Sequence, residues 1–306
     1  MASWEADALL DYLISIMLTA SIYAIFALGL NLQWGYAGLL NFGHVAFMAI
    51  GAYATVLLSM NGVPLLLAVP AGMILAGIAG AFLGMATLKL REDYLAIVTV
   101  GFSEILRFLL LNWAWLTKGS FGLYGYPRPF QDLVSSQNYN LFLAGIVLIT
   151  LIIVYAVLEV LARSPWGRVL KSIRDDETVS ISLGKNAFHY KVQSLILGSA
   201  IAALSGSLLA FYLQYINPMN FQPVETFYAW IIVIMGGSGN NRGTIIGAML
   251  LWGFFSGTRF VEGYLSFSPS ASSATRMVLI GSMLIALMMF RPQGMLGRKE
   301  ELAIGR

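Results

Sequence analysis

Long apolar stretches alternate with short polar breaks along nearly the whole chain. A helix needs roughly 20 apolar residues to cross the hydrocarbon core of a membrane. Stretches near that length predict spanning helices at 12–32, 43–60, 64–88, 94–113, 139–161, 191–215, 225–238, 244–262 and 275–290. The seventh stretch is too short to cross untilted, so we expect a half-helix there.

Composition excludes a soluble protein. Of the 306 residues, 58% are hydrophobic and 11% are charged, whereas soluble domains are about 25% charged. The predicted fold is an all-α, polytopic bundle of about eight to ten transmembrane helices with broken or re-entrant segments. No soluble domain is visible, so we expect residues 1–306 to form one transmembrane domain.

The distribution of charge predicts the orientation, because lysine and arginine favour cytoplasmic loops. Residues 1–12 are acidic and carry no lysine or arginine, unlike a signal peptide, so we expect the N-terminus outside and the C-terminus inside. Most basic residues then fall inside. The exceptions in loops or near span ends are Lys118, Arg128, Arg259 and Arg276.

Two long connections interrupt the apolar pattern. The outer one, 114–138, is rich in Gly, Pro, Ser and aromatic residues, as in an ordered surface loop. The inner one, 162–190, is the one long charged segment. Its "SPWGRVLKSIRDDET" opens with the Ser-Pro pair of a helix start, and Gly184 has the character of a helix stop. We therefore predict a short amphipathic helix on the inner surface.

Small residues recur at every fourth position in two of the predicted spans. In lipid, such stripes let helix backbones approach closely. One stripe is Ser194, Gly198, Ala202, Gly206 and Ala210, and the other is Ala76, Gly80 and Gly84. They predict a tightly packed bundle and carry no information about a substrate.

Polar residues and glycines gather in "GLNLQWGYAGLLNFGHVAFMAIGAY", residues 29–53. Asn31, Gln33, Asn41 and His44 lie there among five glycines. One interpretation is a broken helix beside a transport path, because such segments often mark transporter binding sites. The other is a polar turn after the first span, with His44 capping the next helix. The residues alone leave both open.

Two ionisable residues fall inside a predicted span. Glu104 and Arg107 are three positions apart and therefore share a helix face. They predict either an ion pair that steadies the bundle or, for Glu104, a group facing a water-filled path near a substrate ammonium.

Residue patterns for catalysis, metals and nucleotides are missing from the sequence. There is no cysteine, and the two histidines, His44 and His189, are far apart. The segment nearest to a phosphate loop, "GGSGNNRGT" at 236–244, lacks the required spacing and lysine, so we interpret it as a tight turn. We expect no enzyme activity and no cofactor or metal in this chain.

Four segments together resemble a known family. They are "ALGLNLQWGYAGLLNFGHVAFMAIGAYAT", "LKLREDYLAIVTVGFSEILRFLLLN", "SPWGRVLKSIRDDETVSISLGKNAFHYK" and "RPQGMLGRKE". In this order they resemble permease subunits of branched-chain and neutral amino-acid ABC importers, of the M-type rather than the H-type. The resemblance covers about residues 25–300 and implies a multi-pass protein of the bacterial inner membrane.

The resemblance implies partners and roles that composition does not. Such subunits pair with an H-type permease, two cytoplasmic ATPase subunits and a periplasmic solute-binding protein. It implies that the inner loop docks on an ATPase, through a segment containing Arg168, Arg174, Asp175, Asp176, Glu177 and Gly184. It also favours the first interpretation of residues 29–53, in which Asn31, Gln33, Asn41 and His44 help to line or gate the translocation path. Glu104 is a further candidate for the wall of this path.

Rival functions remain open at this point. Permeases of urea and short-chain amide importers carry similar motifs, so the motifs do not decide the substrate. A self-contained secondary transporter would need coupling-ion residues, for which Glu104 alone is thin support.

Basic residues such as Arg168 and Lys171 on the inner helix could also meet anionic lipid headgroups.

Overall fold

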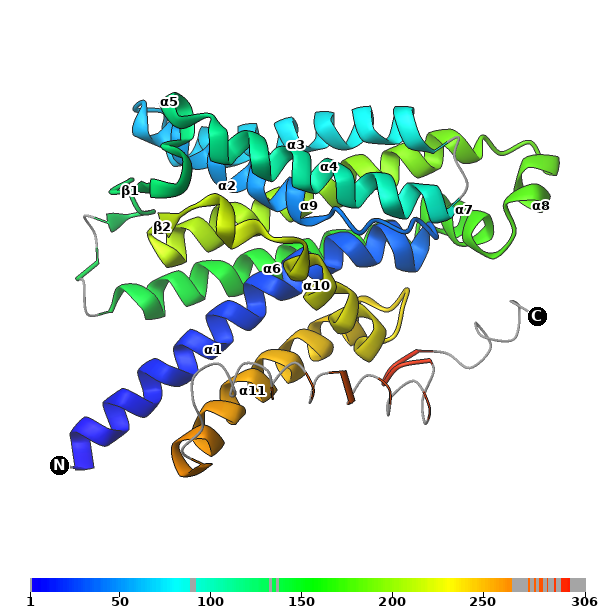
Figure 1. Ribbon diagram of the computed structural model, residues 1–306. Coiled ribbons are helices and arrows are strands. Elements are labelled where there is room, and N and C mark those ends of the chain that lie inside the picture. Colours follow the sequence, from blue (N-terminus) through cyan, green and yellow to red (C-terminus); the bar gives the residue numbers. More distant parts are fainter. Residues whose placement is uncertain are drawn as a thin grey trace.

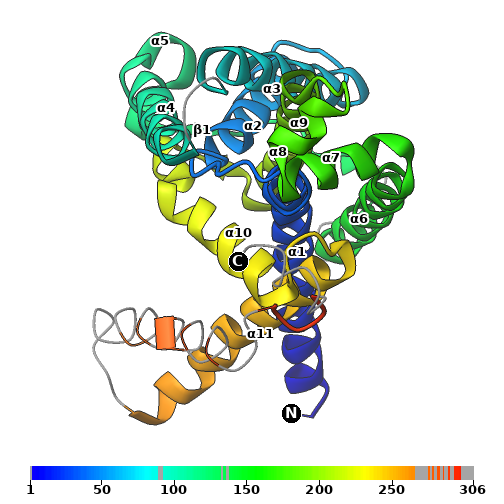
Figure 2. The ribbon, with the colours of Figure 1, turned by 90° about the vertical axis from the view of Figure 1, so that its right-hand side faces the viewer.

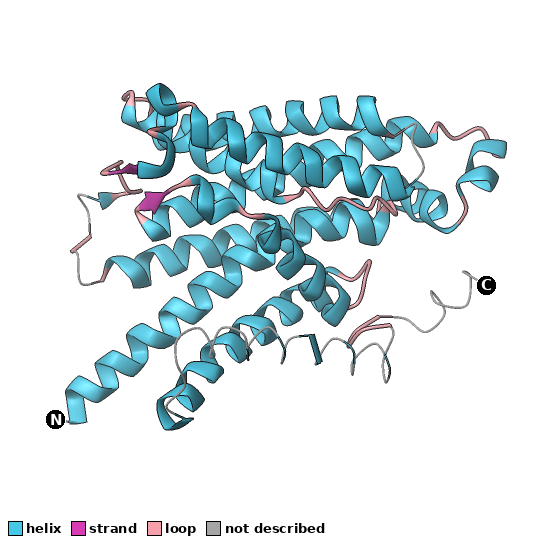
Figure 3. Ribbon diagram, in the orientation of Figure 1, coloured by secondary structure: helices cyan, strands magenta, loops and turns pink. Residues whose placement is uncertain are grey.

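The computed structural model describes residues 2–88, 92–131, 134–135, 138–265, 275, 278, 281–282, 285, 289 and 293–297. Of residues 2–8, 92–93 and 258–265 it describes the backbone alone. The described chain is almost entirely helical (Figure 3).

The long helices are α1 (Ala2–Asn31), α2 (Val45–Met60), α3 (Leu65–Thr87), α4 (Glu92–Asn112), α6 (Tyr139–Arg163), α9 (Ala187–Leu213), α10 (Pro223–Gly236) and α11 (Asn241–Leu265). The shorter ones are η1 (Leu32–Tyr36), a π-helical turn, α5 (Ala114–Thr117), η2 (Gly119–Phe121), α7 (Pro165–Asp175), α8 (Glu177–Ser182) and η4 (Pro218–Phe221). The strands β1 (Leu123–Tyr124) and β2 (Tyr215–Ile216) pair antiparallel.

Helix α1 joins two groups of helices. On one side α9 packs against α2 and α3, and on the other side α6, α10 and α11 pack against α1. Figures 1 and 2 show α5, β1 and the start of α1 at one end of the bundle and α7 and α8 at the opposite end. These are called the β1 end and the α7 end below.

The predicted spans match the structure closely. Five described helical segments are long and apolar enough to cross a membrane, and α2 and α10 are shorter apolar helices. The five are Leu9–Tyr36, Leu65–Thr87, Tyr94–Asn112, Tyr139–Arg163 and Ala187–Leu213. The all-α polytopic bundle is therefore confirmed. The predicted span at 275–290 lies largely outside the described residues.

Both stripes of small residues lie at close helix contacts, as predicted. A Cβ on Gly206 would overlap the Met48 carbonyl oxygen of α2, and one on Gly198 would overlap Gln33 of η1. On α3, a Cβ on Gly80 would meet Ser199 of α9. Glycine at these positions allows the backbones of α2, α3 and α9 to approach one another.

The predicted short amphipathic helix of the inner loop is present as α7, but a second helix, which the sequence did not predict, follows it before Gly184. The segment forms α7 and α8, separated by Asp176 in an extended conformation with φ −156° and ψ 109°. Asp176 breaks the first helix because its carboxylate instead caps the second, accepting the Val179 N–H at 3.0 Å. The start and stop signals were right: Ser164 caps α7, and Gly184 has φ +78° just beyond α8.

Candidate functional site

The break between α1 and α2 is the central feature of the candidate site. Helix α1 widens into the π-helical turn η1 after Asn31, and the chain from 37 to 44 then has no regular structure before α2 starts at Val45. Figure 3 shows this segment as a loop running back from the α7 end into the bundle. A π-turn followed by irregular backbone frees several N–H and C=O groups, which must find other partners in an apolar bundle.

Buried amide side chains form a network around the break and satisfy one of those groups, the Gly43 N–H. Asn41 donates to Gln33 Oε1 at 2.8 Å and accepts the Gly43 N–H at 2.9 Å. Gln33 in turn donates to the Leu195 carbonyl of α9 at 3.3 Å. All three amide residues of the segment, Asn31 included, are fully buried.

Asn31 connects the break to the turn between α10 and α11. Its amide nitrogen donates to Asn241 Oδ1 at 3.0 Å, and its oxygen accepts the Gly239 N–H at 2.9 Å. Ser194 of α9 adds a hydrogen bond to the Leu32 carbonyl at 3.0 Å. The π-turn is thus fixed from two sides by elements more than 160 residues away in sequence.

His44 is fully buried but does not cap α2, so the capping role in the second interpretation was wrong. Its Nε2 lies 3.2 Å from the Phe26 carbonyl of α1, and its ring stacks on Phe26 with centroids 4.8 Å apart. The first N–H of α2, on Val45, is accepted by Thr226 Oγ1 of α10 at 3.0 Å. Nδ1 of His44 has no hydrogen-bond partner within the described part of the chain.

The amphipathic helix α7 is attached directly to η1. Arg174 donates from Nη1 to the Gly35 carbonyl at 2.5 Å and forms an ion pair with Asp175 at 3.0 Å. Lys171, one turn earlier, lies over the Tyr36 ring with 5.1 Å between its nitrogen and the ring centroid. Two residues of α7 therefore contact the π-turn at the point where the transmembrane helix breaks.

The remaining residues of the predicted coupling segment bond to groups outside η1. Arg168 donates to the Arg163 carbonyl at 3.0 Å, and Glu177 pairs with Lys191 of α9 at 2.6 Å. The Thr178 hydroxyl, followed by the Val179 N–H, lowers the pKa of Asp176 below its ordinary value by hydrogen bonding to the carboxylate. Gly184 is exposed in the turn to α9.

Glu104 is separate from this network. Arg107 holds its carboxylate with three hydrogen bonds, the shortest 2.6 Å, so the predicted ion pair is confirmed. The side chains of Glu104 and Arg107 are 31% and 13% exposed. Arg107 also contacts the sulfur of Met219 in η4 at 3.7 Å.

Several contacts of the candidate site were not predicted from the sequence. The "GGSGNNRGT" segment does form a turn, but Gly239 and Asn241 in it hold Asn31. Glu225 in α10 accepts a hydrogen bond from Tyr23 at 2.5 Å, although sequence reasoning singled out Glu104 alone among the acids in spans. The available signal was the position of each polar residue beside a predicted span end.

No group of three or more potential metal ligands occurs among the described residues.

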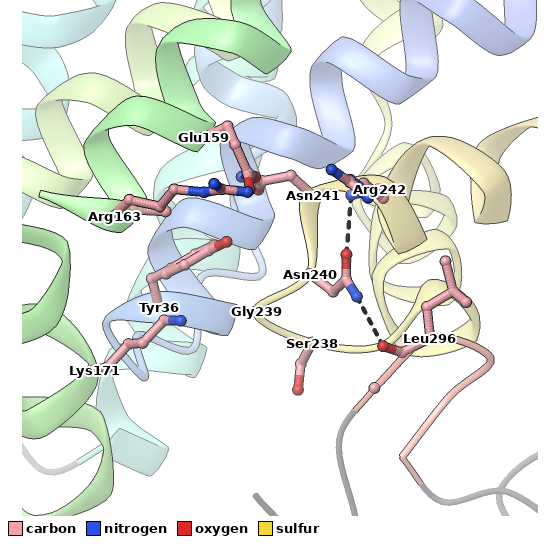
Figure 4. Close-up of a pocket in the computed structure, with 12 residues that line it drawn as sticks. Tyr36, Glu159, Arg163, Lys171, Ser238, Gly239, Asn240, Asn241, Arg242 and Leu296 are labelled. Carbon is pink, nitrogen blue, oxygen red and sulfur yellow. Dashed lines mark hydrogen bonds and ion pairs between the residues drawn. The ribbon is translucent and has the colours of Figure 1, made fainter.

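A polar cavity of about 360 Å³ lies beside the α7–η1 contact (Figure 4). Its walls come from α6, η1, α7, the turn before α11, and the short segment 293–297. The lining residues are Tyr36, Glu159, Ala162, Arg163, Lys171, Ser238, Gly239, Asn240, Asn241, Arg242, Leu296 and Gly297.

Comparison with known proteins identifies the family. A family model described as "Branched-chain amino acid transport system / permease component" matches residues 12–288. The high-affinity branched-chain amino acid transport system permease protein LivM of Escherichia coli K12 is 32% identical over 298 residues, covering 90% of this chain and 68% of that protein. A probable LivM of Methanocaldococcus jannaschii is 28% identical over 333 residues, covering 95% of this chain and 94% of that protein.

The second permease type is also similar, at lower identity. LivH of Salmonella typhimurium is 27% identical over 301 residues, with 92% of each chain covered. No solved structure matches the chain. The resemblance to M-type permeases is therefore confirmed, and the chain belongs to the family of permease components of branched-chain amino acid transport systems.

Proposed function

We propose that this chain is the M-type translocation subunit of an ATP-driven importer and carries branched-chain or other neutral amino acids through the membrane. The observation that carries the mechanism is the contact of α7 with η1 through Arg174 and Lys171. A helix that projects from the bundle and is bonded to a broken transmembrane helix can pass a rigid-body movement to that break. The 162–190 loop is thus the coupling loop of a single permease domain.

The partners follow from this role. An H-type permease completes the pathway, two cytoplasmic ATPase subunits bind and hydrolyse ATP, and a periplasmic binding protein delivers the solute. The chain itself performs no chemistry on the solute. Arg168, Arg174, Asp175, Asp176, Glu177 and Gly184 lie on or beside the surface offered to an ATPase.

Charge supports a cytoplasmic α7 end. Described basic residues gather there, namely Arg163, Arg168, Lys171, Arg174, Lys185, Lys191 and Arg242, whereas Lys118 and Arg128 lie in the loop at the β1 end. Under the positive-inside rule the N-terminus of α1, which lies at the β1 end, is outside.

The network around the break suits gating better than direct contact with the solute. Asn31, Gln33, Asn41 and His44 are fully buried, and their hydrogen bonds go to protein groups. We propose that they set the position of the break and that a change of their partners accompanies opening. Glu104 remains a candidate for the pathway wall because its side chain is partly exposed.

Reconstitution tests this function. Proteoliposomes containing this chain, its copurifying permease and ATPase subunits, and the binding protein should take up leucine, alanine or proline only with ATP inside. Competition with glutamate and urea then defines the substrate class. Uptake by this chain alone under an ion gradient would instead establish a secondary transporter, and competition by urea alone would establish a urea or amide importer.

A further inference from the structure

We propose that the cavity between α6, η1, α7 and the turn before α11 binds a phosphate group, supplied by the headgroup of an anionic lipid. Its volume of about 360 Å³ lies within the range of small-molecule sites, about 300–1,000 Å³. The cavity shares Lys171 and Tyr36 with the α7–η1 contact, but its test measures lipid binding and does not depend on the proposed transport function.

The charges in the cavity walls favour an anion. Arg163 and Glu159 neutralise each other, with two hydrogen bonds of 2.9 and 2.7 Å. This leaves Lys171 and Arg242, neither of which has an ion-pair partner in the part of the chain that the structure describes. Two cations beside one neutralised carboxylate give the cavity a net positive charge.

Donors for a phosphate lie on opposite walls. Arg242 uses its Nε to hold the Tyr155 hydroxyl at 3.0 Å, which fixes the guanidinium on α11 while its terminal nitrogens keep their donors. Lys171 on α7 rests against the Tyr36 ring, which orients its ammonium group without consuming a hydrogen bond. Ser238 adds a hydroxyl from the turn (Figure 4).

The place of the cavity favours a lipid as the source of the phosphate. It lies at the α7 end of the bundle, where the apolar helix α6 finishes at Arg163, whose side chain is 71% exposed. Basic pockets between transmembrane helices at a membrane surface hold anionic lipid headgroups. A phosphate bound between Lys171 and Arg242 would join α7 to α11 and so strengthen the attachment of α7 to the bundle.

Lipid binding to the full-length purified chain tests this inference. Native mass spectrometry and thermal unfolding would be measured with dioleoyl phosphatidylglycerol, with dioleoyl phosphatidylcholine and with inorganic phosphate. We expect phosphatidylglycerol to stay bound to the chain in the mass spectrum and to raise its unfolding temperature. The double variant Lys171→Gln/Arg242→Gln should weaken this binding by about tenfold or more, because two charge-assisted contacts are removed. Lys185→Gln, which removes an exposed charge at the same end but outside the cavity, should bind normally.

The outcomes distinguish a lipid headgroup from a soluble phosphate, and a specific site from the absence of one. Stabilisation by inorganic phosphate that the double variant abolishes would support the same site with a soluble phosphate as its ligand. Restored binding in Lys171→Arg/Arg242→Lys would support a role for charge. Equal phosphatidylglycerol binding in the wild type and the double variant, or equal binding of phosphatidylcholine, would overturn the proposal. If the double variant does not fold, a photoreactive phosphatidylglycerol on the wild type should label the cavity-lining segments, and labelling confined to other regions would overturn it.

Discussion

At the residue scale, the most consequential groups are the buried amides that hold the irregular segment after α1 to itself and to α9. Gln33 and Asn41 are fully buried and bonded to each other, and each also bonds to backbone. A buried polar group that loses its partner costs about 1–3 kcal/mol, more than an ordinary hydrogen bond contributes. The irregular segment is therefore stable only while this set of partners is complete.

Asn41→Ala should destabilise the protein more than its size implies. It removes the acceptor of the Gly43 N–H and the donor to Gln33, and leaves both groups buried without a partner. We expect a loss of about 2–4 kcal/mol, seen as a lower unfolding temperature of the purified protein. Asn61→Ala is the control, because Asn61 is exposed and its amide bonds only to the Leu57 carbonyl. An Asn41→Ala protein as stable as the control would contradict the role of the amide network.

Glycines in the bundle differ in what surrounds them, which gives a matched pair of variants. Gly206→Ala would drive a methyl group into the Met48 carbonyl of α2, and overpacking of this kind costs about 1–3 kcal/mol. Gly145→Ala, in the middle of α6, meets no atom within 4 Å and should stabilise its helix by about 0.5–1 kcal/mol. Thermal unfolding of the two variants should therefore shift in opposite directions. Equal shifts would show that α2 and α9 are not packed as closely as described.

At the scale of elements, one short helix and one turn meet the break in α1. Helix α7 contacts η1 through Arg174 and Lys171, and the turn before α11 contacts the same region through Gly239 and Asn241. These two elements, distant from each other in sequence, thus converge on the end of α1 and on its π-helical turn.

Arg174→Ala should uncouple ATP hydrolysis from uptake in the assembled transporter. The variant removes the bond from α7 to the Gly35 carbonyl, so α7 can move without moving η1. We expect ATPase activity to remain and uptake per ATP to fall about tenfold, a change of about 1.4 kcal/mol in coupling. Arg168→Ala removes the same charge from α7 without touching η1 and should have a smaller effect. Equal effects of the two variants would show that charge, and not the η1 contact, matters.

At the scale of the whole molecule, the two ends of the bundle differ in structure. The β1 end carries α5, η2 and the small β1–β2 sheet, and the α7 end carries α7, α8 and most of the described basic residues (Figure 1). This asymmetry fits the proposed function, in which a solute-binding protein meets one end and ATPase subunits meet the other.

Cysteine labelling can establish the orientation directly, because the chain has no cysteine of its own. In right-side-out membranes, a membrane-impermeant maleimide should label Lys118→Cys from outside, because residue 118 is exposed at the β1 end. Lys185→Cys, exposed in the turn after α8, should be labelled only in inside-out membranes. The reverse result would invert the topology and remove α7 from the ATPase side.

Much of the architecture could be predicted from the sequence because it depends on local patterns. The lengths of the apolar stretches predicted α1 to α4, α6 and α9 to α11. Ser164 and Gly184 marked a helix start and a helix stop, and the spacing of glycines marked the close contacts of α9. These features follow from hydrogen bonding within a segment and from the cost of exposing backbone in lipid.

The candidate site depended on tertiary structure. Asn31 meets Asn241 across 210 positions, and Arg174 meets Gly35 across 139. The sequence marked Asn31, Gln33, Asn41 and His44 as unusual, yet left open whether they end a turn or support a broken helix. Only the fold revealed their partners, because the partner of a freed backbone group is whichever polar side chain packing brings within hydrogen-bond distance, and no local periodicity encodes that.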